Sequence, residues 1–293
     1  MNRIGESELI LNERGAMYHL DARPEEMADT IITVGDPGRV NNVSKHFDSI
    51  EYKCQHREFI THTGYIGKKR LSVVSTGIGP DNIDIVINEL DALHNMDLDN
   101  RVPKTQLKSL NIIRVGTSGA LQEDIPPDSF VVSTHGIGLD NLMHFYSVET
   151  SVAENDILQA FVTQTQLDNH LSYPYLTPAN TRLMNLFFGG FHHGMTVTCP
   201  GFYGPQGRVL RLGLAQPYLV DHLTSFRYGN FRVTNFEMET AAIYGLGKAL
   251  GHRCLSISSI VANRITKKFS DNPSKSIENL IVKTLTILAG ENY

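Results

Sequence analysis

The sequence predicts one α/β domain with a central mixed, mostly parallel sheet flanked by helices. Short apolar runs alternate along the chain with longer segments whose apolar residues have helical spacing. Several of the short runs end in glycine-rich segments, as strands do where they lead into helices. The chain has 293 residues with no repeat and no long linker, so we assign residues 1–293 to a single domain.

The predicted strands are short runs rich in apolar and β-branched residues. In chain order they are 31–34, 71–75, 112–115, 130–132, 195–198, 232–234 and 255–261. Glycine-containing segments stop the first three: Gly-Asp-Pro-Gly at 35–38, Thr-Gly-Ile-Gly-Pro at 76–80 and Gly-Thr-Ser-Gly at 116–119. We therefore expect these three segments to be loops at strand ends.

The predicted helices lie between these runs. After residue 80, apolar residues at 83, 86, 87, 90 and 93 share one helical face. The other predicted helices are 154–170, 179–188, 238–250 and 276–288, and Gly251 ends the third of them. Segment 96–109 is polar and irregular, so we expect a surface loop there.

Composition limits the partners and the compartment. The net charge is −5 and the pI is about 6.2, so no broad positive field exists to attract nucleic acid or an anionic membrane. The three cysteines are far apart, without a C-x-x-C pair, which argues against disulfides and a zinc ribbon. The first 20 residues have no apolar core typical of a signal peptide, and no run suits a membrane span. We expect a cytoplasmic protein.

Two of the glycine-rich strand ends carry an arginine. Arg39 closes the segment 35–39, and Arg114 begins the segment 114–120, which also supplies hydroxyl groups. In open α/β sheets ligands bind beyond the carboxyl ends of strands, and glycine backbone with arginine suits a phosphate group. Each segment alone could equally be an ordinary tight turn. Neither a P-loop nor a G-x-G-x-x-G fingerprint is present, which disfavours a dinucleotide site.

An ordered set of motifs carries a resemblance to a known family. The motifs are 35–39 (Gly-Asp-Pro-Gly-Arg), 56–59 (His-Arg-Glu-Phe), 75–79 (Ser-Thr-Gly-Ile-Gly), 114–120 (Arg-Val-Gly-Thr-Ser-Gly-Ala) and 236–240 (Phe-Glu-Met-Glu-Thr). Over residues 18–264 the chain resembles the nucleoside phosphorylase family, which includes uridine phosphorylase and hexameric purine nucleoside phosphorylase. The resemblance implies a nucleoside phosphorylase-like domain whose co-substrate is inorganic phosphate, with no other cofactor.

The resemblance also implies a phosphate site that two subunits share. The positions matching the family's phosphate ligands are Gly35, Arg39, Arg114 and Thr117. Arg57 matches an arginine that reaches into the neighbouring subunit's site, where it would help to hold the phosphate, and His19 matches a neighbour's histidine that touches the ribose 5′-hydroxyl. Several guanidinium groups together can neutralise a phosphate dianion. We therefore expect a homo-oligomer, dimer or hexamer.

Ribose binding is implied for the motif around residue 238. Glu239 would accept hydrogen bonds from ribose hydroxyls, Met238 would pack on the sugar, and Glu237 belongs to the same segment. On the residues alone, the two glutamates could equally be solvated acids in a first helical turn. Glu58 matches a position that helps to bind a monovalent cation such as potassium between subunits in some relatives.

The segment 202–208 indicates which base is bound. It resembles the base-reading segment of uridine phosphorylases, where Phe202 would stack on the pyrimidine and Gln206 with Arg208 would read uracil. A carboxamide can accept from uracil N3–H and donate to a carbonyl oxygen. Donors aimed at the uracil oxygens would stabilise the charge that develops as the glycosidic bond breaks. Arg264 matches a further arginine near the base.

The implied reaction is phosphorolysis of uridine by a pentosyltransferase, with Arg114, Gln206 and Arg208 as the catalytic groups. Purine phosphorylases and nucleosidases of this family use an aspartate after the last strand, whereas residues 258–264 contain no acid. Those two activities remain alternatives, as does a nucleoside-binding protein without turnover. A Rossmann dehydrogenase is disfavoured by the missing glycine fingerprint. Tolerance for deoxyuridine or thymidine stays open.

Overall fold

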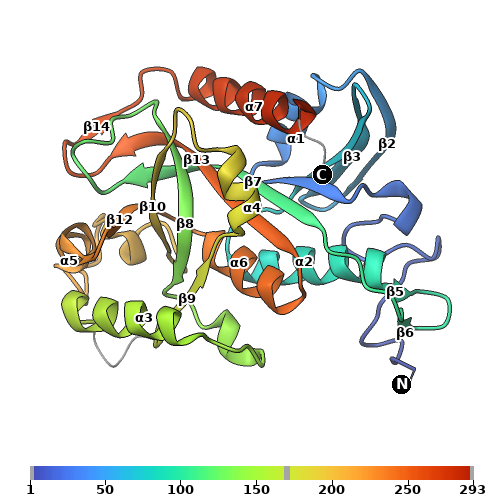
Figure 1. The fold of residues 1–293 in the computed structure, drawn as a ribbon, viewed down its shortest axis with the longest axis horizontal. Coiled ribbons are helices and arrows are strands. Elements are labelled where there is room, and N and C mark those ends of the chain that lie inside the picture. The colour runs from blue at the N-terminus through green and yellow to red at the C-terminus, as the bar shows by residue number, and fades with distance from the viewer. Residues whose placement is uncertain (1–2, 168–171, 291–293) are drawn as a thin grey trace.

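The computed structural model describes residues 3–167 and 172–290, which form one large sheet with helices on both of its faces (Figure 1). The sheet has 12 strands, and its main path runs β11-β12-β10-β8-β13-β7-β1-β4-β3-β2. The strands are β1 (Thr30–Val34), β2 (Ser49–His56), β3 (Phe59–Ile66), β4 (Lys69–Ser75), β7 (Asn111–Ala120), β8 (Phe130–Gly138), β9 (Tyr175–Pro178), β10 (His192–Thr198), β11 (Arg227–Tyr228), β12 (Phe231–Glu237), β13 (Arg253–Asn263) and β14 (Lys268–Phe269). The predicted α/β class is confirmed.

The sheet contains two parallel groups of strands, joined and flanked by antiparallel pairs. Strands β4, β1, β7 and β13 are parallel neighbours, and so are β8, β10 and β12. Strand β1 is buried along its whole length, as expected for a Thr-Ile-Ile-Thr-Val run between two partners and two helical layers. Antiparallel pairs join β13 to β8 and β2 to β3.

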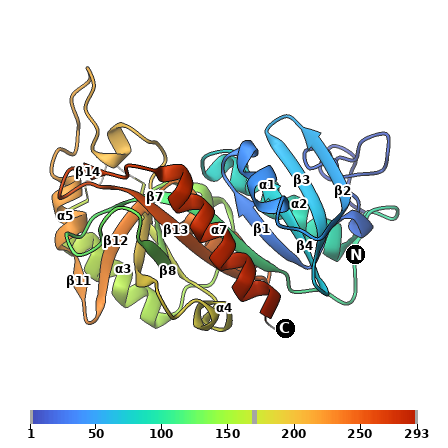
Figure 2. The same ribbon diagram turned by 90° about the horizontal axis from the view of Figure 1, so that it is seen from above.

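One part of the sheet closes on itself. Strand β12 pairs with β10 and also, in antiparallel fashion, with the end of β7, where Asn235 faces Ala120 and Phe236 faces Gly119. Strands β7, β13, β8, β10 and β12 therefore form a closed ring of hydrogen-bonded neighbours. Figure 2 shows this ring beside the more open β1–β4 part of the sheet.

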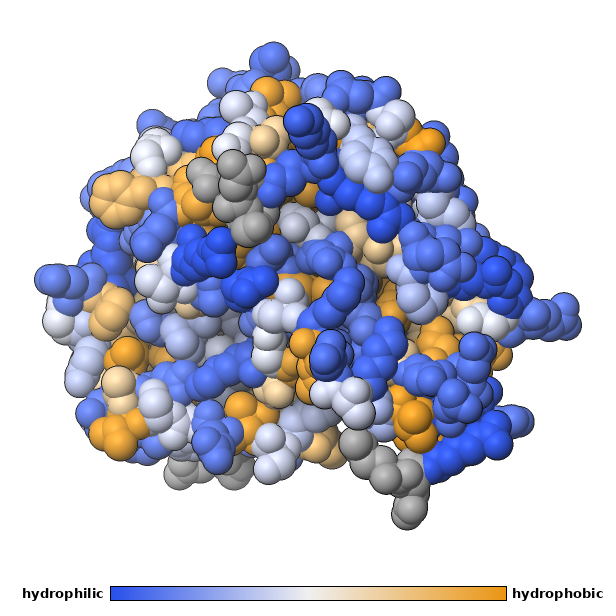
Figure 3. All heavy atoms as spheres, turned by 45° about the vertical axis from the view of Figure 1, so that its right-hand side comes forward, coloured by the Kyte–Doolittle hydropathy of each residue, from blue (hydrophilic) through white to orange (hydrophobic). Residues whose placement is uncertain are grey.

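The helices cover both faces of the sheet. Helices α1 (Pro37–Ser44) and α7 (Pro273–Gly290) lie above it in Figure 1, and α2 (Pro80–Asn95), α6 (Thr240–Ala249) and α3 (Val152–Thr165) lie below it. The shorter helices are α4 (Thr181–Leu186) and α5 (Leu219–Ser225), and the 3-10 turns are η1 (Pro24–Glu26), η2 (Leu142–Phe145) and η3 (Gly204–Gln206). In the described residues, no helix has the length and apolar character needed to cross a membrane. The face in Figure 3 is mostly hydrophilic, with scattered hydrophobic patches.

One predicted strand-end loop is wrong, and another follows the end of its strand as predicted but is shorter than expected. The segment 35–39 contains the start of α1, because the Asp36 carboxylate accepts a hydrogen bond from Gly38 N–H (2.9 Å) and Pro37 occupies the first turn. The segment 116–119 continues β7 instead of ending it, because β13 and β12 both pair with these residues. Arg39 therefore projects from a helix, and Thr117 from a strand.

Other boundaries differ more modestly. The predicted helix 154–170 ends at Thr165, and its residues 168–170 lie outside the described residues. The predicted helix 238–250 begins at Thr240, after the acidic motif. Segment 96–109 contains a short hairpin of β5 (Met96–Asp97) and β6 (Val102–Pro103), and the β2–β3 hairpin was not predicted.

Candidate active site

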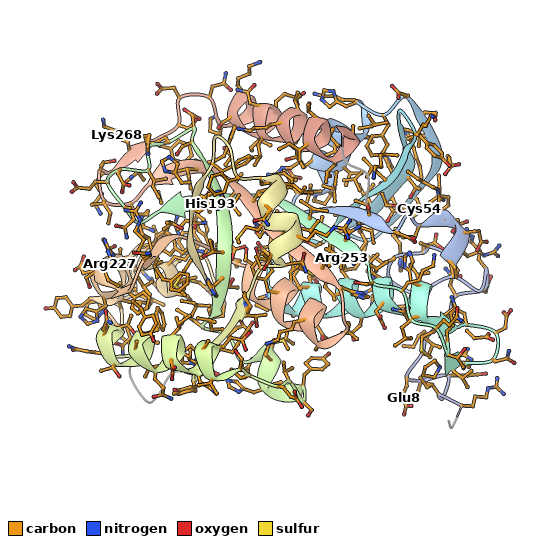
Figure 4. The ribbon with its side chains drawn as sticks, in the orientation of Figure 1. Glu8, Cys54, His193, Arg227, Arg253 and Lys268 are labelled. Atoms are coloured by element: carbon orange, nitrogen blue, oxygen red, sulfur yellow. The ribbon has the colours of Figure 1, made fainter. Side chains whose placement is uncertain are left out.

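A cavity of about 280 Å³ lies beside the ring, where the carboxyl ends of β1, β7, β12 and β13 meet. In Figure 4, Arg253 marks the start of β13, and Lys268 of β14 lies near the opposite, cavity end of that strand. The lining residues are Gly35, Asp36, Arg39, Ile78, Arg114, Thr117, Ser118, Gly119, Phe202, Gln206, Arg208, Phe236, Glu237, Met238, Glu239, Val261, Ala262 and Phe269. The site predicted from separate motifs is thus gathered largely in one place.

Two arginines converge on one end of the cavity. The Arg39 guanidinium donates to the Val115 carbonyl (3.3 Å), which brings it across β1 to β7. Burial, together with the nearby charge of Arg114, lowers the pKa of Arg39. Two guanidinium groups held this close repel each other, and a bound anion would relieve that repulsion. Gly35 and Thr117 line the same cavity, so four of the five predicted phosphate-binding residues lie together, and the fifth, Arg57, does not line it.

Arg114 is paired with the two glutamates of the Glu-Met-Glu motif. Its Nη2 lies within hydrogen-bonding distance of Glu239 Oε2 and 3.1 Å from Glu237 Oε2. Burial opposes its charge, but these carboxylates hold the pKa of Arg114 above its ordinary value. The guanidinium also lies close over Gly116, where a Cβ atom would meet Arg114 Nη1 at 1.8 Å. A strand residue with any side chain at 116 would therefore displace this arginine.

The junction of β12 and α6 holds the predicted ribose residues. Glu237 and Glu239 are both buried, and Met238 between them is half-buried and lines the cavity. Glu239 Oε1 accepts a hydrogen bond from Gly79 N–H (2.9 Å). Gly79 has φ +100°, a backbone conformation that favours glycine. The segment 75–79, to which the sequence assigned no cation, therefore positions Glu239.

The other end of the cavity carries the predicted base-reading residues. Gln206 is buried, and its Oε1 accepts a hydrogen bond from Arg208 Nη1 (2.6 Å). The Arg208 guanidinium lies 3.8 Å from the Phe202 ring centroid, a cation–π contact, and that ring remains 49% exposed. Burial, with the charge of Arg264 nearby, lowers the pKa of Arg208 to about 10. Among the described residues no partner is seen for Gln206 Nε2, so this amide group is left to donate.

The strand next to the base end is not acidic. Val261 and Ala262 of β13 line the cavity, and the whole strand, Arg253–Asn263, contains no acidic residue. The acidic residues among the lining are Asp36, Glu237 and Glu239, and Asp36 caps α1. The two carboxylates left in the cavity therefore lie at the Arg114 end.

Four predicted site residues do not line the cavity. Arg264 donates to the backbone carbonyls of Gln206 (2.9 Å) and Gly207 (3.5 Å), so it supports the base-reading segment from behind. His19 and Arg57 lie together outside the cavity, because both contact the Tyr18 ring. The His19 ring centroid is 4.9 Å from that of Tyr18, and the Arg57 guanidinium carbon is 5.8 Å from it. Glu58 lies beside Gly77, and its carbonyl accepts from Ser75 Oγ (2.6 Å).

His19 is held in place by an acid. Its Nδ1 lies 2.6 Å from Glu89 Oε1, and its backbone N–H donates to the same carboxylate (3.1 Å). Arg57 is exposed and has φ +54°. Within the described ranges, no group of three or more His, Cys, Asp or Glu side chains is placed to hold a metal ion. The monovalent cation at Glu58 stays a prediction.

The sequence reasoning assigned no site role to several apolar lining residues, and two of them are largely exposed. Ile78 and Phe269 are each 66% exposed although they border the cavity. Ile78 lies between two glycines of positive φ, a local signal that this side chain is held outward. Phe269 lies on the short strand β14, and its sequence context carries no comparable signal.

Comparison with known proteins finds matches over most of the chain. A family model described as the phosphorylase superfamily matches residues 29–289. A uridine phosphorylase of Thermococcus kodakarensis is 29% identical over 279 residues, covering 94% of this chain and 88% of its own. A purine nucleoside phosphorylase of Vibrio cholerae is 23% identical, covering 91% and 95%. The structure of a Trypanosoma brucei nucleoside phosphorylase, described as showing uridine phosphorylase activity, matches with TM-score 0.85, 32% identity, and coverage of 95% and 99%.

Proposed function

Since this chain belongs to the phosphorylase superfamily, we propose that it is a uridine phosphorylase, a pentosyltransferase that converts uridine and inorganic phosphate into uracil and ribose 1-phosphate. The observation that carries this proposal is the base end of the cavity. Gln206 and Arg208 line the cavity together with the apolar Val261 and Ala262. A carboxamide and a guanidinium complement the N–H and carbonyl edge of uracil. A purine would need a proton donor, and β13 offers no acid.

The phosphate end supplies charge and position. Arg39 and Arg114 would hold the phosphate with Thr117 and the backbone at Gly35, below the sugar. Phosphate would then attack C1′ while Glu239 holds the ribose hydroxyls and an oxocarbenium-like sugar develops. Gln206 and Arg208 would donate to the uracil oxygens as the bond to the base breaks. Catalysis then rests on positioning and electrostatic stabilisation of charge that forms only in the transition state.

The test is product analysis with purified protein. Uracil release from uridine is measured with and without inorganic phosphate, with 2′-deoxyuridine, thymidine and inosine as further substrates. We expect uracil only when phosphate is present, and little hypoxanthine from inosine. Release without phosphate would make the protein a hydrolase. Preferential cleavage of inosine would favour the purine alternative, and no product from any nucleoside would indicate a binding protein.

A variant at the base end gives a sharper test. Gln206→Ala is expected to lower kcat/KM for uridine by about 10²-fold, because a donor to the developing charge is lost. Phosphate affinity should stay close to that of the wild type, because Arg39 and Arg114 are untouched. A matched loss in phosphate affinity would mean that Gln206 supports the whole cavity instead of reading the base.

We further propose a homo-oligomer, dimer or hexamer, with shared sites. His19 and Arg57 lie together but do not line their own chain's cavity, which fits residues that serve a neighbour. Arg57→Ala and Arg39→Ala should each be inactive alone. When the two variants are co-expressed, mixed dimers regain one complete site, roughly a quarter of the wild-type activity. A fully active monomer in light scattering would contradict this.

We propose a cytoplasmic enzyme of pyrimidine salvage. Cys54, Cys199 and Cys254 are all unpaired, and Cys199 and Cys254 are buried, which suits a reducing compartment. Burial raises the pKa of the Cys54 thiol, so it is not an activated nucleophile (Figure 4 labels it on β2). Cell fractionation would test the location.

A further inference from the structure

We propose that Thr198 and Glu237 form a hydroxyl–carboxylate pair that positions Arg114 and the first turn of α6 without touching the substrate. This inference rests on the proposed function for the identity of the sugar. It separates the two glutamates of the Glu-Met-Glu motif, both of which the family resemblance assigned to ribose. Glu239 would be the ribose acceptor, and Glu237 its support.

Groups of the protein surround both carboxylate oxygens of Glu237. Oε1 accepts from Thr198 Oγ1 (2.7 Å) and Thr240 N–H (3.1 Å). Oε2 accepts from Glu239 N–H (2.9 Å) and lies 3.1 Å from Arg114 Nη2. The Thr240 N–H is shared between the two oxygens, since it also lies 3.0 Å from Oε2. A carboxylate offers about four acceptor positions, and three donors of the protein bond to Glu237 while the Arg114 guanidinium lies in ion-pair contact beside them. Glu237 therefore has fewer open acceptor positions for a ribose hydroxyl than Glu239 has.

Glu239 is placed differently. Its Oε1 accepts from Gly79 N–H, and its Oε2 accepts from Arg114 Nη2. Half of its acceptor capacity remains, which matches the two hydroxyl groups of a ribose. Burial raises the pKa of Glu239, and the Arg114 charge opposes this rise. The state of this carboxylate thus depends on where Arg114 is held.

Thr198 fixes Glu237 from behind. It ends β10 and is fully buried, and its Oγ1 accepts from Ala241 N–H (2.8 Å). Because that amide occupies the acceptor side, the hydroxyl proton points to Glu237 Oε1. One hydroxyl therefore ties β10 to the start of α6 and also orients the carboxylate that holds Arg114.

The experiment compares four variants with one matched control. Thr198→Val removes the hydroxyl at nearly constant volume, and Thr198→Ser restores it. Glu237→Gln and Glu239→Gln change each carboxylate in turn. Thr284→Val is the control, because Thr284 is equally buried but lies on α7, with its hydroxyl on Leu280 O. For each protein, kcat and KM are measured with uridine and with 2′-deoxyuridine, and phosphate affinity is measured by its effect on Tm.

The positioning role predicts a pattern across substrates. Thr198→Val and Glu237→Gln should lower kcat/KM for uridine and 2′-deoxyuridine by the same factor, roughly tenfold or more, because neither residue contacts the 2′-hydroxyl. Glu239→Gln should lower kcat/KM by a larger factor for uridine than for 2′-deoxyuridine. Thr198→Ser should recover most of the activity that Thr198→Val loses. If Glu237→Gln discriminates between the two nucleosides as Glu239→Gln does, Glu237 contacts the sugar and the proposal is wrong.

Phosphate affinity separates this proposal from the proposed function. Thr198→Val should bind phosphate several-fold more weakly than Thr284→Val, because Arg114 is less well held. Equal binding by these two variants would overturn the positioning role alone. A wild-type protein that binds phosphate but releases no uracil would overturn the proposed function alone.

Discussion

Replacing Gly116 with alanine should lower the activity strongly while lowering Tm only slightly. A Cβ atom at this position would lie 1.8 Å from Arg114 Nη1, 2.5 Å from Cζ and 2.8 Å from Nη2. Ordinary contact begins near 3.4 Å, so the guanidinium must move by about 1.6 Å. The obstructed atoms are the end of a flexible side chain, and a cavity lies beside them. Gly116 also has no positive φ, so its backbone suits alanine.

The expected loss follows from the contacts of Arg114. Moving the guanidinium breaks its bond to Glu239 and its alignment toward the phosphate end of the cavity. A charge-assisted hydrogen bond contributes about 1.5–3 kcal/mol, equivalent to roughly tenfold to 150-fold in kcat/KM. We expect the KM for phosphate to rise and Tm to fall by only a few degrees.

The assay is steady-state uracil release over a series of phosphate concentrations, with Tm measured in parallel. Gly189→Ala is the matched control, because a Cβ atom there meets nothing within 4 Å. If kcat/KM for phosphate in Gly116→Ala stays within about twofold of the wild type, the arrangement of Arg114 over Gly116 is not required for activity. A collapse of Tm with no folded protein would show that the strand itself cannot accept the side chain.

Two further predictions concern pH. Because the pKa of Arg208 is lowered to about 10, kcat/KM for uridine should fall as pH rises through 10, and this limb should be absent from the residual activity of Arg208→Ala. Burial lowers the pKa of His135 from 6.5 to about 4, so the unfolded chain binds more protons between these values. The contribution of neutral His135 to the free energy of unfolding is therefore fully present above pH 6.5, and about 3 kcal/mol of it is lost as pH drops toward 4. In urea unfolding, the free energy of unfolding of His135→Gln should depend less on pH over that range.

The sequence predicted the sheet and most of the cavity residues because their signals are local. Apolar runs mark the buried strands, the ordered motifs carry Arg39, Arg114 and Glu239, and the segment 202–208 carries Gln206. The β2–β3 hairpin escaped because β2 alternates exposed and half-buried residues, such as Glu51 and Tyr52, instead of forming an apolar run. Strand β2 forms because it pairs with β3, and such a tertiary contact cannot be read from the residues of β2 alone.

The roles inside the cavity could not be predicted from motifs alone. The pairing of Arg114 with Glu239 depends on β7 and β12 being brought together, although 125 residues separate them. The strand end at 116–119 was misjudged because Gly-Thr-Ser-Gly has good turn chemistry, yet two neighbouring strands pair with it. Arg264 was matched to the base, but its bonds to the backbone of Gln206 depend on loop packing that no spacing encodes.

The closed ring of strands places the phosphate and ribose residues on a rigid part of the molecule and the base-reading residues on a separate, more exposed part. Strand β7 carries Arg114 and Thr117, strand β12 leads into the Glu-Met-Glu motif, and their direct pairing makes these groups parts of one stiff frame. The base-reading residues lie outside that frame, on a largely exposed connection after β10 that Cys199 N–H and Arg264 fasten to it. Exchange of this connection alone could therefore change which base is accepted while the chemistry at C1′ stays the same, so the base preference of such a frame can evolve independently of its reaction.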